Sequence, residues 1–149
     1  MKKILIVLAL LTGWHSTGVN AVTQEDMENI VKGIVKVVES KKGYVVFDYK
    51  EVRMALISDV SHDRMRIITP ITKYSSLNLE QIGKIMDSNF HNALDARYAS
   101  SNDVLYSAFI HPMSPLSQEQ LTDALDQVAT LALTFGTSYS SGQLSYVGK

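Results

Sequence analysis

The chain has 149 residues, with 14 basic side chains, 15 acidic side chains and no cysteine. A chain of this length forms one domain that buries roughly two-thirds of its unfolded surface, so it can form a stable core without covalent cross-links. The lack of cysteine excludes disulfides, thiolate chemistry and the lipid attachment used by bacterial lipoproteins.

The first 21 residues have the pattern of a secretory signal peptide. Lys2 and Lys3 form its basic start, Ile4–Leu11 is its apolar centre, and small residues end it at Ala21. The apolar run is shorter than the roughly 20 residues that a membrane-spanning helix needs. We therefore expect cleavage after Ala21, no stable membrane insertion afterwards, and a periplasmic or secreted protein.

Removal of residues 1–21 takes away two lysines and no acid. The mature chain then has 12 basic and 15 acidic side chains, and no basic block. This balance argues against nucleic acid as a partner. Residues 22–136 are predicted to form a single α+β domain, and the polar residues 137–149 a flexible tail.

The first predicted helix begins at Thr23, a good N-cap, and is ended by Gly43. Its apolar face consists of Met27, Ile30, Val31, Ile34 and Val38. Three strands are expected next, at Tyr44–Phe47, Val52–Ile57 and Met65–Thr72, with a turn at residues 48–51. Pro70 cannot donate to a strand ladder, so it predicts an edge or a bulge.

A second helix is predicted from a capping box of Asn78 and Gln81. Its apolar residues are Leu79, Ile82, Ile85, Met86 and Phe90. A hairpin follows, formed by strands Leu94–Ala99 and Val104–His111 around a tip at residues 100–103.

The third predicted helix, Ser117–Phe135, has a capping box of Ser117 and Gln120 and ends at Gly136. The resulting order, α-β-β-β-α-β-β-α, predicts an α+β fold with a five-stranded antiparallel sheet flanked by helices. Leu131 and Leu133 lie off the main apolar stripe of this helix and widen it, which suggests either contact on two sides or contact with a partner.

The strand Val104–Ile110 is apolar on both faces, as expected where a helix covers one face and something else covers the other. Tyrosine is also enriched where proteins meet. We therefore expect an apolar, partner-facing surface on the hairpin and the third helix. Its candidate residues are Tyr98, Val104, Tyr106, Ala108, Ile110, Leu131 and Leu133.

The sequence has none of the short motifs that mark catalytic, phosphate-binding or metal-binding sites. His62, with Asp59 and Asp63 around it, could suggest a small hydrolase, but a solvated loop is the simpler interpretation. Asp95 and Arg97 are expected to form a solvated ion pair. We predict no catalytic residue, cofactor or metal, and keep a small-ligand sensor with a pocket between helix and sheet as an alternative.

Three passages resemble the YbjN-like family of bacterial sensory transduction regulators, which has the type III secretion chaperone-like fold. They are the helix with Ile82, Met86 and Asn89-Phe90, the hairpin Leu94–His111, and the corner Pro112 followed by Leu116-Ser117. The resemblance implies an antiparallel sheet flanked by helices, a homodimer, and a role in binding a protein or peptide. An export signal departs from secretion chaperones, which work in the cytosol.

Overall fold

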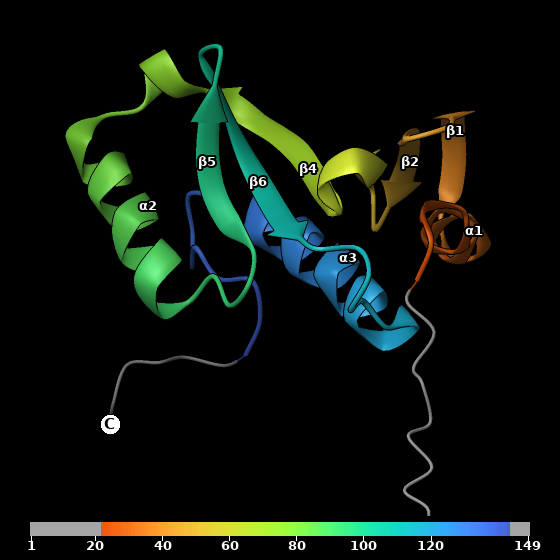
Figure 1. Cartoon of the computed structure of the whole chain (residues 1–149). Coiled ribbons are helices and arrows are strands. Elements are labelled where there is room, and N and C mark those ends of the chain that lie inside the picture. Colours follow the sequence, from red (N-terminus) through yellow and green to blue (C-terminus); the bar gives the residue numbers. More distant parts are fainter. Residues whose placement is uncertain (1–21, 144–149) are drawn as a thin grey trace, which may run out of the picture.

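The structure, a computed structural model, describes residues 22–143 (Figure 1). The predicted signal peptide therefore lies outside the described residues. The elements are α1 (Gln24–Ile34), β1 (Lys36–Lys41), β2 (Tyr44–Tyr49), β3 (Val52–Asp59), η1 (Val60–His62), β4 (Arg64–Lys73), η2 (Tyr74–Ser76), α2 (Leu79–His91), β5 (Arg97–Ser101), β6 (Val104–His111) and α3 (Gln118–Leu133).

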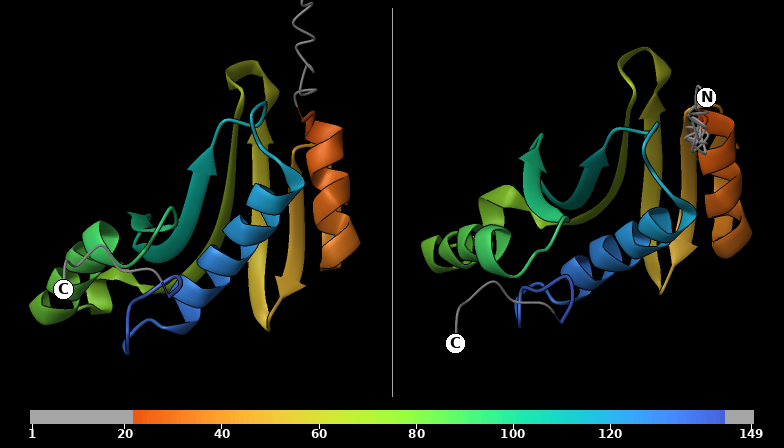
Figure 2. Two further views of the ribbon diagram at one scale, coloured as in Figure 1. Left: turned by 90° about the horizontal axis from the view of Figure 1, so that it is seen from below. Right: turned by 60° about the horizontal axis from the view of Figure 1, so that its bottom comes forward.

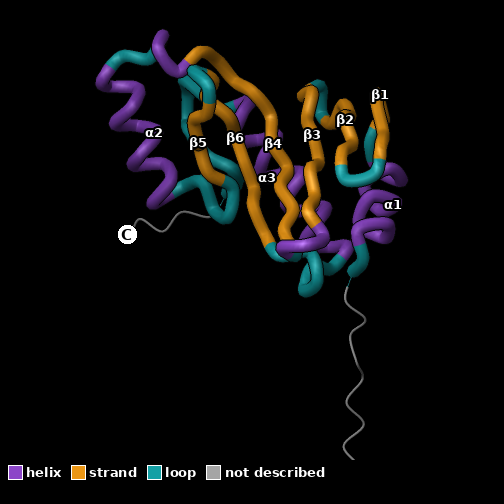
Figure 3. The backbone as a smooth tube through the Cα atoms, turned by 45° about the horizontal axis from the view of Figure 1, so that its top comes forward, coloured by secondary structure: helices purple, strands orange, loops and turns teal. Residues whose placement is uncertain are grey.

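The strands form one antiparallel sheet in the order β1-β2-β3-β4-β6-β5 (Figure 3). Helix α3 contacts β3, β4, β5 and β6 on one face of this sheet, while α1 contacts α3 and α2 contacts β5. Figure 2 shows α1 beside the β1 end of the sheet and α2 at the opposite end. The fold therefore has a helix-covered face and an open face.

The sheet has six strands, so the prediction of five is wrong. Helix α1 stops at Ile34, and the next residues turn back as β1 to pair with β2. Val35, Val37 and Val38 are β-branched, and such residues pack better in strands than in helices. Gly43 does not end a helix. It lies in the turn between β1 and β2, with a φ of 80° that suits glycine.

Two turns lie within the predicted residues but are shorter than predicted, and one strand starts later than predicted. Lys50 and Glu51 form the β2–β3 turn, and Asn102 and Asp103 the β5–β6 turn, each with positive φ at both positions. Such two-residue turns match the twist of a hairpin. Leu94 also has a positive φ, of 52°, so β5 begins at Arg97 instead of Leu94.

The predicted helix starts are confirmed. Thr23, Asn78 and Ser117 each cap a helix, and each forms a reciprocal capping box with the third helical residue. The irregularity predicted at Pro70 is also confirmed, because the register of β4 against β6 shifts between Pro70 and Thr72.

The core lies between the covered face of the sheet and α3. Its largest fully buried side chains include Phe47, Met54, Leu56, Ile67, Leu105, Leu121, Leu125 and Leu131. Gln127 of α3 is buried among them, and its Oε1 accepts hydrogen bonds from the backbone amides of Asp95 and Ala96 at 2.9 and 3.0 Å. This side chain joins α3 to the chain that leads into β5.

The chain beyond Gly136 continues the domain. Tyr139 and Ser141 are buried, and the Ser88 hydroxyl donates to the Tyr139 carbonyl at 2.5 Å. The Tyr139 ring also contacts the rings of Tyr98 and Phe135. The flexible tail predicted from residue 137 is therefore corrected for residues 137–143. Within residues 22–143, no helix is long and apolar enough to cross a membrane.

Candidate protein-binding surfaces

The open face of the sheet is defined by the register of its strands. Tyr44, Ile57, Arg66 and Ile110 stand side by side on β2, β3, β4 and β6. The next row contains Val46, Ala55, Ile68, Ala108 and Arg97. These residues alternate with the buried ones, so their side chains project away from α3.

The structure divides the predicted partner-facing surface among three places. Val104, Tyr106, Ala108 and Ile110 lie on the open face, where Ile110 is 60% exposed but Ala108 is buried, so the prediction of an exposed Ala108 is wrong. Tyr98 and Leu131 are buried instead, and the Tyr98 hydroxyl donates to the Leu131 carbonyl at 2.9 Å. Burial raises the pKa of the Tyr98 phenol well above its usual range. Leu133 is exposed by itself on α3.

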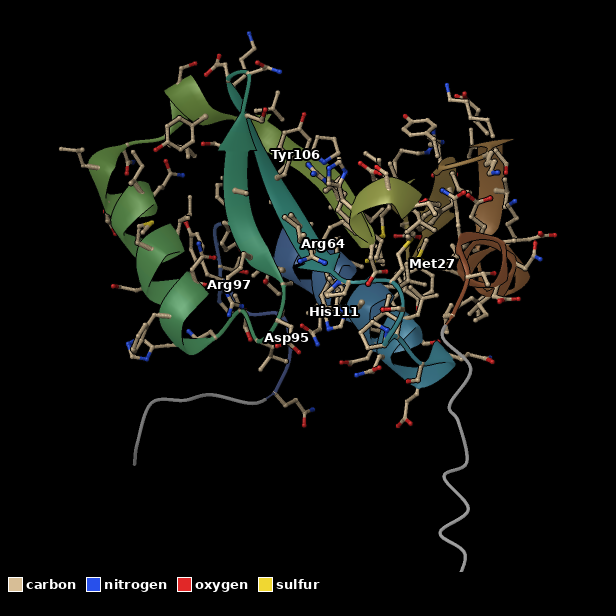
Figure 4. The ribbon with its side chains drawn as sticks, in the orientation of Figure 1. Met27, Arg64, Asp95, Arg97, Tyr106 and His111 are labelled. Carbon is tan, nitrogen blue, oxygen red and sulfur yellow. The ribbon has the colours of Figure 1, made fainter. Side chains whose placement is uncertain are left out.

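Arginine side chains surround the apolar centre of the open face, and Figure 4 labels Arg64, Arg97 and the neighbouring Tyr106. Arg53 is neutralised by Asp48, with which it forms an ion pair. The guanidinium of Arg97 donates to the carbonyls of Leu94 and Ala96, so the predicted ion pair with Asp95 does not form.

A hollow of about 590 Å³ lies at the η1 end of the open face. Ile57 and Ile110 contribute apolar wall, and Arg64 and Arg66 contribute positive charge. The remaining lining residues are Ser58, Asp59, His62 and Met65.

Helix α2 has an exposed apolar side, formed by three of the five apolar residues predicted for it. Leu79, Met86 and Phe90 are 87%, 63% and 78% exposed, whereas Ile85 and Ser88 face the domain. The three exposed residues follow helical spacing and form one stripe. Gly83 lies in the same stripe, and nothing is within 4 Å of where its Cβ would be. We call these residues the α2 stripe.

The two edges of the sheet differ in how far they are covered. Strand β1 is exposed along its whole length, with Val37 and Val38 among its residues, and β5 is the opposite edge strand. Edge strands offer unpaired backbone groups to another chain. The β5 edge lies next to α2, where the Asn89 side chain accepts from the Tyr98 amide at 2.8 Å and donates to the Tyr98 carbonyl at 3.1 Å, so α2 covers part of this edge.

The loop acids suggested for a hydrolase serve the fold. Asp63 accepts hydrogen bonds from the Ser114 hydroxyl and from the backbone amides of Ser114 and Met113, which lower the pKa of its carboxyl group. Asp59 accepts from the Ser61 hydroxyl and also contacts His62, and these contacts lower its pKa to about 2. The two carboxylates thus have separate partners, and the described residues contain no group of side chains suited to a metal ion.

The other histidines do not contribute to a site. His91 ends α2 and packs against Phe90, and its buried Nδ1 makes no hydrogen bond. His111 is half-buried, as predicted, and stacks on Phe109. A hollow of about 830 Å³ beside α1 is lined mainly by polar and charged residues, unlike the apolar pocket that a small-ligand sensor would need.

The fold is also seen in a solved structure, "Structure of the HopA1-SchA Chaperone-Effector Complex". One of its chains superposes with a TM-score of 0.54 and 11% sequence identity, over 74% of this chain and 96% of that chain. The likeness confirms an α+β, type III secretion chaperone-like fold, with one strand more than predicted. No family model and no curated protein matches the sequence.

Proposed function

We propose that this chain is an exported, non-enzymatic protein-binding module that acts in a chaperone-like or regulatory way and associates with itself. The observation that carries the proposal is the α2 stripe. A helix of a small domain normally turns its apolar side inward, so large apolar side chains on its solvent side indicate a partner. The chaperone-like fold, which is shared with a chain from a chaperone–effector complex, supports the same reading.

A second copy of the chain fits the α2 stripe. Gly83 lies between Leu79 and Met86, and a small residue at that point lets another helix approach closely while large side chains interlock on either side. Two copies related by a two-fold axis would bury the same stripe on both sides.

The proposal places the protein in the periplasm or outside the cell, on the basis of the signal-peptide pattern in residues 1–21. The YbjN-like resemblance, carried by the α2 passage, the β5–β6 hairpin and the corner before α3, supports a regulatory role. An exported location distinguishes this module from a cytosolic secretion chaperone, so its partner would be another exported or envelope protein.

Light scattering coupled to size exclusion tests self-association of the mature chain, residues 22–149. We expect twice the monomer mass for the wild type and the monomer mass for Phe90→Glu, because a carboxylate in an apolar interface disfavours assembly. Leu133→Glu, which changes an exposed leucine on α3, should leave the mass unchanged.

Binding of a permanently unfolded test protein, such as reduced and carboxymethylated lactalbumin, tests the chaperone-like part. We expect saturable binding by the wild-type chain. A wild type that is monomeric at high micromolar concentration and also fails to bind the unfolded protein would contradict the proposed function.

A further inference from the structure

We propose that the open face of the sheet, at the hollow beside η1, binds an extended partner segment in which an acidic residue stands among apolar ones. This inference rests on the proposed protein-binding function and names the chemistry of the partner. Its centre is Arg66, which lies between Ile57 and Ile110 in one row of the sheet.

The apolar part of this site is continuous across strands. The row from Tyr44 through Ile57 and Arg66 to Ile110 spans four adjacent strands, or about 14 Å at the usual strand spacing of about 4.8 Å. Ile68 and Ala108 lie next to it in the following row. Alternate side chains of an extended segment point the same way, so such a segment can place several apolar groups on this surface.

The charge of the site selects an acidic partner. Arg66 is exposed and, within residues 22–143, has no carboxylate or hydrogen-bond partner. Arg64 lines the same hollow, and its guanidinium donates to the backbone carbonyl of Asp63. The one acid in the hollow, Asp59, is engaged by Ser61 and His62. Guanidinium groups bind carboxylates with two parallel hydrogen bonds, so a partner carboxylate is the complement that this hollow lacks.

The hollow also favours a carboxylate that is attached to apolar groups over a free anion. Ile57 and Ile110 provide apolar wall within the 590 Å³ next to Arg66. An inorganic anion would leave these side chains in water, whereas a protein segment would cover them and exclude water from the charge pair.

Fluorescence anisotropy with a short labelled peptide tests the site on the mature chain. In the extended probe peptide, every second residue is serine, and the residues between the serines are leucine, leucine, glutamate, leucine and leucine. The control peptide has glutamine in place of glutamate. We expect the glutamate peptide to bind about tenfold tighter, the ratio for one charge-assisted pair. Added salt should reduce this preference.

Variants then assign the preference to Arg66. Arg66→Met should bring the two peptides to within about twofold of each other, because it keeps the apolar stem and removes the charge. Lys73→Met, which removes a positive charge from the far end of the same strand, should keep the preference. Ile110→Ser should weaken both peptides equally. Unchanged melting temperatures would show that these variants fold.

The outcomes separate this inference from the proposed function. Equal binding of both peptides to the wild type, or a preference that survives in Arg66→Met, overturns the inference. If the chain still binds unfolded lactalbumin in that case, the protein-binding function stands and only the acidic site is wrong. If neither the peptides nor the unfolded protein binds, both proposals fail.

Discussion

Asp63 and Ser114 are joined by two hydrogen bonds across 51 residues of sequence. The Asp63 carboxylate accepts from the Ser114 amide at 2.9 Å and from the Ser114 hydroxyl at 2.7 Å. It also accepts from the Met113 amide at 3.1 Å. These bonds tie the start of β4 to the corner that precedes α3, so the loop acid positions the helix that covers the sheet.

The Asp63 carboxylate makes stability dependent on pH. Its bonds to Ser114 are the main cause of a pKa below the usual 3.8. A lowered folded-state pKa contributes stability above the unfolded value, and this contribution is lost as pH falls through the folded value. We therefore expect Asp63→Asn to melt a few degrees below the wild type at pH 7, and the gap to close below about pH 4.

Thermal unfolding between pH 2 and 7 measures this difference. Asparagine tolerates the left-handed backbone of residue 63, where φ is 49°, so the change removes charge without adding backbone strain. Asp87→Asn, at an exposed carboxylate of α2, is the control and should not change the pH profile. A gap between Asp63→Asn and the wild type that stays constant over the whole range would contradict the prediction.

Gln127 should matter more to stability than its polar character suggests. Substitution by methionine keeps the volume but leaves the amides of Asp95 and Ala96 without an acceptor. An unsatisfied buried donor costs about 1–3 kcal/mol, so we expect Gln127→Met to lower the free energy of unfolding by about 2–4 kcal/mol. Urea titration measures it, with the exposed Gln118→Met as control. A loss below about 1 kcal/mol would mean that water replaces the lost acceptor.

Two leucines of α3 provide a matched test of its orientation. Leu131 has no exposed surface and Leu133 is 60% exposed. Leu131→Ala should cost about 2–5 kcal/mol of unfolding free energy, because it creates a cavity in the core. Leu133→Ala should change stability by less than about 0.5 kcal/mol. Equal losses of unfolding free energy in urea titrations would contradict this orientation of α3.

Tyr139 tests whether the segment after α3 belongs to the domain. Its ring packs against Tyr98 and Phe135, and its carbonyl accepts from Ser88. We expect Tyr139→Ala to cost about 3 kcal/mol, the lower end for removal of a large aromatic side chain from a core. Ser138→Ala, at the exposed neighbouring position, should have no measurable effect. Limited proteolysis should cleave the Tyr139 variant faster after Gly136.

The sequence predicted those features of the fold that depend on interactions between residues close together in the chain. The capping boxes at Asn78 and Ser117 involve side chains three residues apart and predicted two helix starts, and the N-cap residue Thr23 predicted the third. The alternation along Val104–His111 likewise predicted β6 with its observed bounds. The positive φ of Lys50 and Glu51 could not be predicted from the sequence, because lysine and glutamate do not favour this conformation.

The remaining errors arose where tertiary packing decides. The segment from Val35 to Val38 fits a helical apolar stripe as well as a strand, and its pairing with β2 selects the strand. Tyr98 and Leu131 were expected at a surface, yet they meet each other under the sheet. The α2 residues Met86 and Phe90 were predicted to be part of the apolar pattern of this helix, and they face solvent. Periodicity shows that a helix has an apolar side but does not show what that side meets.

The position of α3 in the chain has a consequence for the order of synthesis. It is the last helix in the described residues, and it covers strands from β3 through β6. While the chain is being made, Leu56, Ile67 and Leu105 therefore exist before the helix that keeps them from water. A nascent chain that ends before Gln118 presents a sheet with both faces wet, so the domain becomes stable only when nearly all of it has been synthesised.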